Sequence, residues 1–556
     1  MKLNMPIGVS NFKKLIDENY YFVDKTHFIK ELIDGHSDVT LITRPRRFGK
    51  TLAMSMLRYF FTMENAEENR ALFAGLDIER AGDAYMAEQG TRPVVFLTLK
   101  DIKMNTWDSC LVAIRESLSD LYSNYEFLET SDKLSIRDKS IYHSILFDKA
   151  KDETYMNALK ILSDLLEKHY KKKIIILIDE YDTPIQYAWE KGYYDDAIEF
   201  FRNFYSSALK DSPSLDFAVL TGVLRISKES IFSALNNLEV SSVIHGRFSD
   251  AMGFTRAEVS KMAESLGLFD KIAEIHEWYD GYNFSGCEIY NPWSVLNYFH
   301  QDCDPRPYWV NTSGNGILNV LLSHIDDVRR EEIGDLMKGD TVSAILDESV
   351  VYSEIKESST ALYMMLVTSG YLKCIKRIRR DDENWGELAI PNREVRTLFK
   401  REIIKHITAN HDSRRLYTML DAMLDGNAAK FESLLQKVLL ENAGIHDTAR
   451  YPEAFYNGLM LGFGMLIAES HDIASNGESG EGRFDIAFIP YENTKPGVIM
   501  EFKKADSEAQ MDKKAAEALL QIEKKNYATA LTKRGVTEIW KYGVAFCGKR
   551  VKLLRG

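Results

Sequence analysis

Four short apolar segments, set between long helical stretches, constrain the fold of this 556-residue chain more than any other feature. Each is about five residues long and rich in aliphatic or β-branched residues, which is typical of a strand buried on both faces. Apolar strands that alternate with helices form a parallel sheet covered by helices, so the sequence predicts an α/β protein. The segments are 39–43, 94–99, 174–178 and 217–221.

The composition indicates a globular protein of several domains. Hydrophobic residues make up 45% and charged residues 28%, with only 12 prolines, which excludes collagen-like and largely disordered chains. The formal net charge of −13 argues against a general polyanion binder, so a nucleic-acid contact would need a local basic surface. From Glu501 onward, 13 Lys and Arg residues face only 7 Asp and Glu residues.

Cysteine usage and hydropathy predict a cytoplasmic location. The five cysteines are scattered without a CxxC pair, which argues against a disulfide framework or a zinc ribbon and fits a reducing compartment. The first ten residues lack the apolar core of a signal peptide. The longest apolar-rich run, 455–468, is shorter than the roughly 18–20 residues that cross a bilayer. We therefore expect a soluble, cytoplasmic protein without a membrane segment.

Changes in pattern along the chain predict four regions. Residues 1–224 would hold the parallel sheet, and 225–316 a helical, aromatic-rich extension. Residues 317–405 would form a winged-helix-like region, because a strand pair follows helices there, and 406–556 a second α/β domain. The sequence leaves open whether copies of the chain form a homo-oligomer.

The loop at 44–51, RPRRFGKT, lies between the first strand and a predicted helix. Gly49, Lys50 and Thr51 match the end of the phosphate-loop pattern GxxxxGK[ST], in which Lys reaches the β/γ-phosphates and the hydroxyl holds Mg²⁺. Arg44 replaces the first glycine, and Pro45 removes an amide donor. The strand before the loop and the helix after it support a nucleotide site in spite of this partial match.

A carboxylate pair, Asp179 and Glu180, directly follows the third apolar segment. In phosphate-loop ATPases such an Asp completes the Mg²⁺ shell, and the Glu orients the attacking water. The alternative is a structural turn with an acid pair that caps a strand. The occurrence of loop and acid pair in the right order favours the nucleotide site.

Four other residues are weaker candidates for phosphate contacts. Thr221 and Arg225, at the end of the fourth strand, are candidates to sense the γ-phosphate and stabilise its charge, although a strand-end structural role is favoured for each. Arg46 and Arg47 would contact phosphate or coat the surface, with neither role preferred.

Further segments accompany these motifs: MPIGVSNF at 5–12, YFVDKT at 21–26, WYDGY at 278–282 and YNPWS at 290–294. Together with RPRRFGKT and the LIDEYD segment that contains Asp179, they resemble the AAA-ATPase-like proteins common in gut and anaerobic bacteria. The resemblance covers most of 1–311, and loops of that family characteristically begin with Arg. It implies a P-loop NTPase fold with ATP binding and hydrolysis, and it implies no particular substrate.

Two of these segments also have structural interpretations. Asp24 or Thr26 would cap the helix that follows, or else contact the base or ribose of a nucleotide. The glycine of WYDGY, Gly281, indicates a tight turn within an aromatic core, with an interface role as the alternative.

A second motif lies near the C-terminus. Glu501 and Lys503 stand two residues apart in the apolar segment 498–503, so both would point to one face of a strand. Pairing with the alternating segment 483–489 would bring Asp485 close to both. Two adjacent carboxylates repel unless a cation joins them, and Mg²⁺ prefers oxygen ligands. The Lys would then orient water or stabilise charge, as in metal-assisted phosphodiester cleavage.

This arrangement resembles the PD-(D/E)XK nuclease superfamily, over about residues 451–548. The resemblance implies that Glu453 is the upstream acid and that Gln521 is the polar residue on the helix after the strand pair. Phe484 stands where the motif has Pro. The partner would be nucleic acid, with DNA expected over RNA, and the cofactor Mg²⁺.

These observations lead to two functional hypotheses. The first is an ATP-binding and ATP-hydrolysing protein whose C-terminal domain is a Mg²⁺-dependent nuclease. The alternative is a nucleotide-controlled switch whose C-terminal domain binds nucleic acid or protein without cleaving it.

Overall fold

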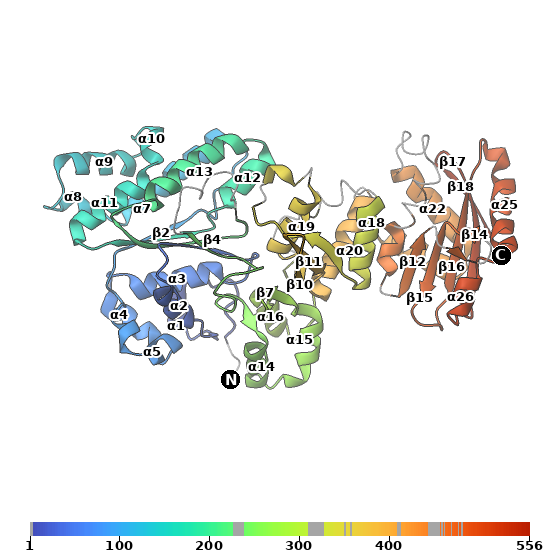
Figure 1. Cartoon of the computed structure of the whole chain (residues 1–556), viewed down its shortest axis with the longest axis horizontal. Helices are drawn as coiled ribbons and strands as arrows, with labels where there is room; N and C mark the ends of the chain where they lie inside the picture. Colours follow the sequence, from blue (N-terminus) through green and yellow to red (C-terminus); the bar gives the residue numbers. More distant parts are fainter. Residues whose placement is uncertain are drawn as a thin grey trace. The chain divides into compact units, whose positions relative to one another are not determined.

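The computed structural model shows two compact units, Met1–Ile317 with Ser343–Val395, and Leu318–Val342 with Arg396–Gly556 (Figure 1). It describes residues 4–225, 238–309, 318, 327–349, 352–355, 358–408, 413–442, 456, 460, 462–468, 470–475, 478–479 and 482–556.

A five-stranded parallel sheet forms the centre of the first unit. All four predicted strands are present, and β1 and β3 are fully buried, as their apolar composition predicts. A fifth strand was not predicted, because its alternating residues are only partly buried at the sheet edge. The order is β2 (Val94–Thr98), β3 (Ile174–Asp179), β4 (Leu215–Gly222), β1 (Val39–Thr43) and β5 (Leu238–Ser241).

Helices cover both faces of this sheet, as predicted (Figure 1). One face holds an aromatic-rich core in which Phe12, Phe28 and Phe60 pack with Ile175 and Leu177 of β3. The helices on this face are α1 (Phe12–Asp17), α2 (His27–Gly35), α3 (Lys50–Phe61), α4 (Ala66–Arg70) and α5 (Asp77–Arg80). The other face holds α7 (Trp107–Ser123), α11 (Ala158–Tyr170), α12 (Thr183–Lys191) and α13 (Tyr194–Leu209).

Asp24 and Thr26 cap a helix, although not the one that follows them in sequence. The Thr26 side chain makes no cap bond to α2. Instead, Asp24 Oδ2 accepts from the Asp77 amide (2.7 Å) and Thr26 Oγ1 from the Ile78 amide (3.0 Å), so both hold the start of α5. Sequence proximity could not reveal this partner, which lies more than 50 positions away.

The aromatic-rich extension contains helices and also a small sheet that the sequence analysis did not predict. Its helices are α14 (Arg256–Ser265), α15 (Ile272–Tyr279) and α16 (Pro292–His300), and its strands are β6 (Phe254–Thr255), β7 (Tyr282–Phe284) and β8 (Cys287–Tyr290). Gly281 adopts φ 97°, and a Cβ there would lie 2.2 Å from the Pro391 carbonyl oxygen. The aromatic core is therefore confirmed, because Tyr279 and Tyr282 are both buried, and Gly281 joins α15 to β7 in a left-handed conformation.

The middle region has the strand pair expected after helices. A three-stranded sheet joins β10 (Lys373–Arg380) and β11 (Glu383–Ala389), which are antiparallel, to β9 (Val342–Ile345). Helices α18 (Asp327–Lys338) and α19 (Ser359–Thr368) precede this hairpin.

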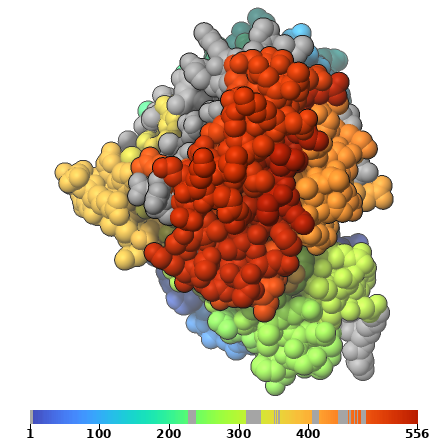
Figure 2. Space-filling view, turned by 90° about the vertical axis from the view of Figure 1, so that its right-hand side faces the viewer, coloured from blue at the N-terminus to red at the C-terminus, as the bar shows by residue number. Residues whose placement is uncertain are grey.

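The second unit contains a mixed five-stranded sheet whose C-terminal part is coloured red in Figures 1 and 2. The β16–β17 pair is parallel and the other pairs are antiparallel. Helix α25 packs closely on β17, where a Cβ on Gly543 would lie 2.2 Å from the Ala515 carbonyl oxygen. The strands are β12 (His471–Ser475), β15 (Ile486–Pro490), β16 (Gly497–Lys504), β17 (Ile539–Cys547) and β18 (Arg550–Arg555). The helices are α20 (Arg393–Thr408), α21 (Ser413–Leu424), α22 (Ala428–Asn442), α25 (Met511–Lys524) and α26 (Thr529–Lys533).

Within the described residues, no helix has both the length and the apolar character needed to cross a membrane. The apolar-rich run 455–468 lies partly outside these residues.

Gly222, at the end of β4, provides a test of this packing. A Cβ there would lie 2.6 Å from Asp182 Oδ1 and from the Tyr181 ring, both in buried residues. Gly222→Ala should therefore lower the free energy of unfolding of the first unit by about 1–3 kcal/mol. Calorimetry of the full chain should show a lower transition midpoint. Gly334→Ala, in the second unit, where a Cβ meets nothing within 4 Å, should leave the transition midpoint of the first unit unchanged.

Candidate functional sites

The loop between β1 and α3 is a tight turn. Gly49 adopts φ 88° as the N-cap of α3, a conformation that glycine adopts at little cost. Arg47 adopts φ 70°. Lys50 and Thr51 follow as the first residues of the helix, whose N-terminus favours bound anions.

Lys50 is almost fully buried, with 4% of its surface exposed. Its ammonium group donates to the carbonyl oxygens of Arg44 and Pro45, each at 3.0 Å. Burial lowers the pKa of Lys50, and the charges of Glu180 and Asp179 oppose this shift. The ammonium is thus held inside the curve of the loop.

The Asp179 carboxylate, at the end of β3, connects this strand to β4 and to the first turn of α3. Its Oδ2 accepts from Thr51 Oγ1 at 2.8 Å, and its Oδ1 accepts from Thr221 Oγ1 at 2.7 Å. The register places Asp179 between Thr98 of β2 and Thr221 of β4. Burial raises the pKa of Asp179, and both hydroxyl groups counteract this rise.

Glu180 follows directly with φ 54°, a left-handed conformation that is uncommon for a non-glycine residue. Its Oε2 accepts from Thr183 Oγ1 at 2.8 Å. The side chain lines the same cavity as Lys50 and Thr51. The chain direction therefore turns sharply between Asp179, which faces the sheet, and Glu180, which faces the cavity.

A cavity of 480 Å³ adjoins the loop, within the size range of small-molecule sites. One side is formed by the loop residues 46–51 with Glu180, and the other by apolar and aromatic residues that include Ile7, Tyr21 and Trp293. Lys100 and Lys103, after β2, add positive charge to the lining. The sequence analysis missed both lysines, because the β2 segment carries no motif.

The arginines of the loop have different surroundings. Arg44 is fully buried and donates to the carbonyl oxygens of Ser241 (3.0 Å) and Phe248 (2.8 Å), so it holds the start of the loop to the segment after β5. Arg46 donates to Gln186 Oε1 at 3.0 Å, and Arg47 lies 4.4 Å from the centre of the Trp293 ring. Both Arg46 and Arg47 line the cavity.

Thr221 and Arg225 are placed differently from the cavity-lining residues. Thr221 is buried against Asp179. Arg225 lies with Ser242 and Glu348 around a separate small hollow. Among the described residues that line the larger cavity, neither is present.

The second candidate site lies where β15 and β16 pair. Ile486 is opposite Met500 in this antiparallel pair, so the preceding Asp485 comes opposite Glu501. Asp485 Oδ2 accepts from the Phe502 amide at 2.6 Å. The pairing that the sequence predicted is therefore present, and it brings both carboxylates to the same end of the strands.

Glu501 is 3% exposed and is the centre of this cluster. Its Oε1 accepts from Lys503 Nζ at 3.3 Å and from the Gln521 side-chain amide. Its Oε2 is buried and has no hydrogen-bond partner among the described residues. Burial, followed by the charge of Asp485, raises the pKa of Glu501 to about 7. A buried acceptor without a donor, beside a second carboxylate, fits a bound cation.

Gln521 comes from α25, as predicted, and also donates to the Tyr527 hydroxyl at 3.3 Å. The sequence analysis missed Tyr527, because a tyrosine beyond the helix carries no spacing signal. Glu453 lies outside the described residues.

Comparisons with known proteins found a matching family for the part of the chain around each candidate site. Residues 6–232 match the model of a family described as "Predicted AAA-ATPase", and residues 451–555 match that of the PD-(D/E)XK nuclease superfamily. A protein of Azotobacter chroococcum mcd 1, named "Uncharacterized protein in vnfD 5'region", is 27% identical over 543 residues, which cover 96% of this chain and 94% of that protein. The chain therefore combines an AAA-ATPase-like domain with a PD-(D/E)XK nuclease superfamily domain, which confirms both resemblances.

The buried carboxylate of Asp182 should make the stability of the first unit depend on pH. This buried carboxylate accepts from the amides of Val223 (2.9 Å) and Leu224 (2.8 Å), and burial raises its pKa to about 6. Because the folded state binds this proton more tightly than the unfolded state, stability should fall as pH rises from about 4 to 6, by roughly 3 kcal/mol.

Asp182→Asn should remove this contribution. Urea unfolding at pH 4 and 6.5 gives the change in the unfolding free energy of the first unit between the two pH values, and this change should be smaller in the variant than in wild type. The exposed Asp382→Asn variant should keep the wild-type dependence. The same pH-dependent change in unfolding free energy in wild type and Asp182→Asn would contradict the role of Asp182.

Proposed function

We propose that the N-terminal domain binds ATP with Mg²⁺ and hydrolyses it, and that the C-terminal domain is a Mg²⁺-dependent nuclease. One observation carries the first half: Lys50 and Thr51 line a cavity of 480 Å³, and the Thr51 hydroxyl donates to the buried Asp179 carboxylate at 2.8 Å. The domain families support ATPase and nuclease-like roles.

The residues of the first site would divide the work as follows. Lys50 would exchange its two carbonyl acceptors for β- and γ-phosphate oxygens, and Arg46 and Arg47 would contact the phosphates from the cavity wall. Thr51 and Asp179 would hold Mg²⁺, which neutralises phosphate charge when bound. Thr221 fixes the Asp179 carboxylate, and Glu180, whose orientation Thr183 sets, would orient the attacking water.

Arg225 has a weaker place in this proposal. Its position with Ser242 and Glu348 means that it would need to move to reach a γ-phosphate. Its role as a sensor stays a prediction.

At the second site, Asp485 and Glu501 would hold Mg²⁺, which supplies charge stabilisation and an activated water in phosphodiester cleavage. Lys503 would orient that water or stabilise charge on the phosphate. Gln521 positions the Glu501 carboxylate. Nucleic acid is the proposed partner, with DNA favoured over RNA. The basic excess after Glu501 supports a nucleic-acid partner of either kind.

Two lysine substitutions would test both activities separately. Lys50→Ala should reduce ATP turnover by about 100-fold or more, and Lys503→Ala should reduce Mg²⁺-dependent cleavage as strongly while ATP turnover is unchanged. Phosphate release, and cleavage of plasmid, single-stranded DNA and RNA, would measure these effects.

Two exposed lysines provide matched controls. Lys504→Ala changes the next residue of β16, and Lys160→Ala an exposed position of α11. Both should behave as wild type. Equal cleavage by the Lys503→Ala and Lys504→Ala proteins would contradict the nuclease assignment.

The alternative is a nucleotide-controlled switch whose C-terminal domain binds without cutting. The engagement of the Lys50 ammonium by two loop carbonyl groups favours it, because this loop must rearrange before it holds phosphate. Turnover faster than about one per second would exclude a pure switch, since switch nucleotidases are much slower.

A chain of buried contacts would connect the ATP site to helix α20. The Trp309 indole donates to the Arg46 carbonyl oxygen at 3.1 Å, and the Trp309 amide donates to Glu394 Oε1 at 2.7 Å. Glu394 Oε2 accepts from Ser294 Oγ at 2.8 Å, next to the Trp293 that stacks with Arg47. Glu394 lies in the first turn of α20, and this helix continues past the boundary at Val395 into the second unit. The contacts support nucleotide-dependent control of the C-terminal domain.

Glu394→Gln should break this connection, because an amide has only one acceptor oxygen for two donors. A non-hydrolysable ATP analogue should change hydrogen exchange of residues 393–408 in wild type, and this change should be at least halved in the variant. The affinity for the analogue should stay within about twofold. The exposed Glu383→Gln variant is the control. A wild-type response in Glu394→Gln would contradict the connection.

A further inference from the structure

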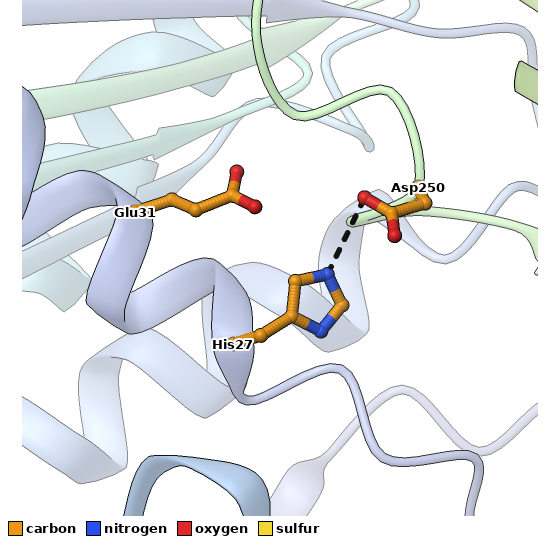
Figure 3. Close-up of side chains that lie close together, drawn as sticks. All are labelled: His27, Glu31 and Asp250. Carbon is orange, nitrogen blue, oxygen red and sulfur yellow. Dashed lines mark ion pairs between the residues drawn. The ribbon is translucent and has the colours of Figure 1, made fainter. Parts of the chain in front are cut away.

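Three potential metal ligands meet outside both sites described above. His27 and Glu31 lie one turn apart on α2, and Asp250 lies in the segment between β5 and β6. Their ligand atoms all lie within 4.8 Å of one another. Figure 3 shows the imidazole and the two carboxylates facing a common space.

The three side chains of this group have few polar partners. His27 Nε2 lies 3.5 Å from Asp250 Oδ1, longer than the roughly 2.7–2.9 Å of a charged hydrogen bond. This nitrogen is buried and makes no hydrogen bond within the described part of the chain. Glu31 is partly buried. No ion pair or hydrogen bond to its carboxylate occurs among the described residues.

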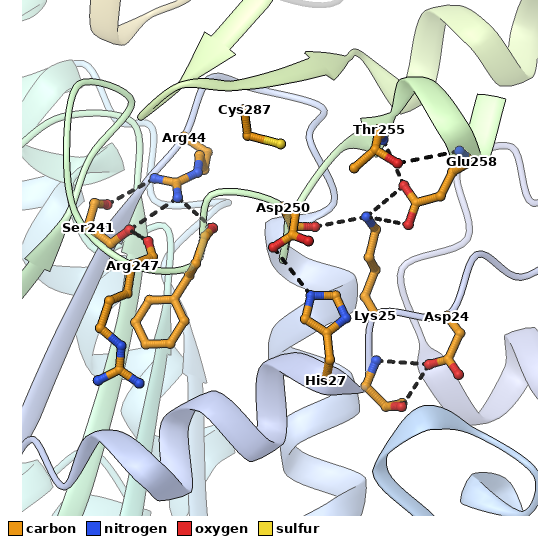
Figure 4. A network of polar contacts seen from close by, with 12 residues as sticks. Asp24, Lys25, His27, Arg44, Ser241, Arg247, Asp250, Thr255, Glu258 and Cys287 are labelled. Atoms are coloured by element: carbon orange, nitrogen blue, oxygen red, sulfur yellow. Dashed lines mark hydrogen bonds and ion pairs between the residues drawn. The ribbon is translucent and has the colours of Figure 1, made fainter. Parts of the chain in front are cut away.

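The neighbouring cations have other partners. Lys25 Nζ lies 2.7 Å from Glu258 Oε1 and donates to the Asp250 carbonyl oxygen at 2.8 Å (Figure 4). Arg247 lies 3.6 Å from Glu239 and donates to the backbone oxygen of Glu31. The imidazole and the two carboxylates therefore carry an excess of negative charge that Lys25 does not neutralise directly.

We propose that His27, Glu31 and Asp250 form a binding site for a divalent transition metal, with Zn²⁺ as the best match. One imidazole nitrogen and two carboxylate oxygens are ligands that Zn²⁺ accepts, and a water molecule would complete four-coordination. Mg²⁺ and Ca²⁺ prefer oxygen ligands only. Zinc bonds of about 2.0–2.2 Å place tetrahedral ligands about 3.4 Å apart, so small side-chain rotations would draw the three groups together.

The bound ion would stabilise the surroundings of the nucleotide loop. It would join α2 to the segment that contains Phe248, whose carbonyl oxygen accepts from Arg44. Three residues beyond Asp250, the Gly253 amide donates to the Phe48 carbonyl oxygen at 3.0 Å. Ala251 and Met252, which lie between Asp250 and Gly253, line the cavity of 480 Å³ that adjoins the loop. The site thus has a structural role next to this cavity and takes no part in hydrolysis.

Titration of the full chain with Co²⁺, in excess Mg²⁺ to fill the oxygen-only sites, tests the proposal. Visible absorption should report one His-ligated Co²⁺ per chain, and Zn²⁺ should displace it. His27→Gln should abolish this absorption, and Glu31→Gln should weaken binding at least tenfold. His143→Gln, which changes another histidine paired with a glutamate (3.1 Å), should have no effect.

Thermal unfolding provides a second measurement that does not depend on absorption. Zn²⁺ should raise the midpoint of the wild-type protein and leave that of Glu31→Gln nearly unchanged. Circular dichroism without metal would establish that each variant is folded. The same Co²⁺ spectrum and the same Zn²⁺-induced shift in wild type and Glu31→Gln would overturn the proposal.

Discussion

The arrangement of the loop, helix α3 and the neighbouring strand in the first unit depends on the hydrogen bonds of the buried Asp179 carboxylate. It accepts one hydroxyl from the first turn of α3 and another from β4, so a single charge fixes the helix after the loop and the neighbouring strand. Burying such a group is costly unless its acceptor sites are used. The two threonines use one oxygen each, and Lys50 is held in the loop that precedes the same helix. Stability and proposed chemistry therefore draw on the same atoms.

The same principle recurs in the second unit with a different outcome. Glu501 is nearly as buried as Asp179, yet only one of its oxygens has donors among the described residues, from Lys503 and Gln521. The opposing strand adds Asp485, whose carboxylate is fixed by the Phe502 amide. A buried carboxylate with one oxygen that lacks a donor, beside a second carboxylate, is stabilised in its charged form by a nearby cation. The Mg²⁺ that we propose for this site would add to the charge of Lys503 in balancing the two carboxylates.

Sequence patterns predicted the elements whose signals are local. The apolar segments 39–43 and 174–178 form buried strands, as their composition and the helices between them predicted. The two-residue period placed Glu501 and Lys503 on one face, and the predicted pairing with Asp485 is present. The edge strand β5 was not predicted, because its partner β1 lies about 200 positions away. The hairpin that contains Tyr282 and the β17–β18 hairpin were also not predicted, although both pair locally. Arg44 holds the segment after β5, and Asp24 caps α5, contacts that are about 200 and 50 positions away. The group of His27 and Asp250 was invisible for the same reason.

A crystal structure of the protein with Mg²⁺ and a non-hydrolysable ATP analogue would test the central claim most directly. The account predicts that the Lys50 ammonium leaves the carbonyl oxygens of Arg44 and Pro45 for the β- and γ-phosphates. It also predicts Mg²⁺ beside the Thr51 hydroxyl and the Asp179 carboxylate, with the base among the apolar residues of the cavity. An analogue bound elsewhere, with Lys50 still donating to the loop, would contradict it.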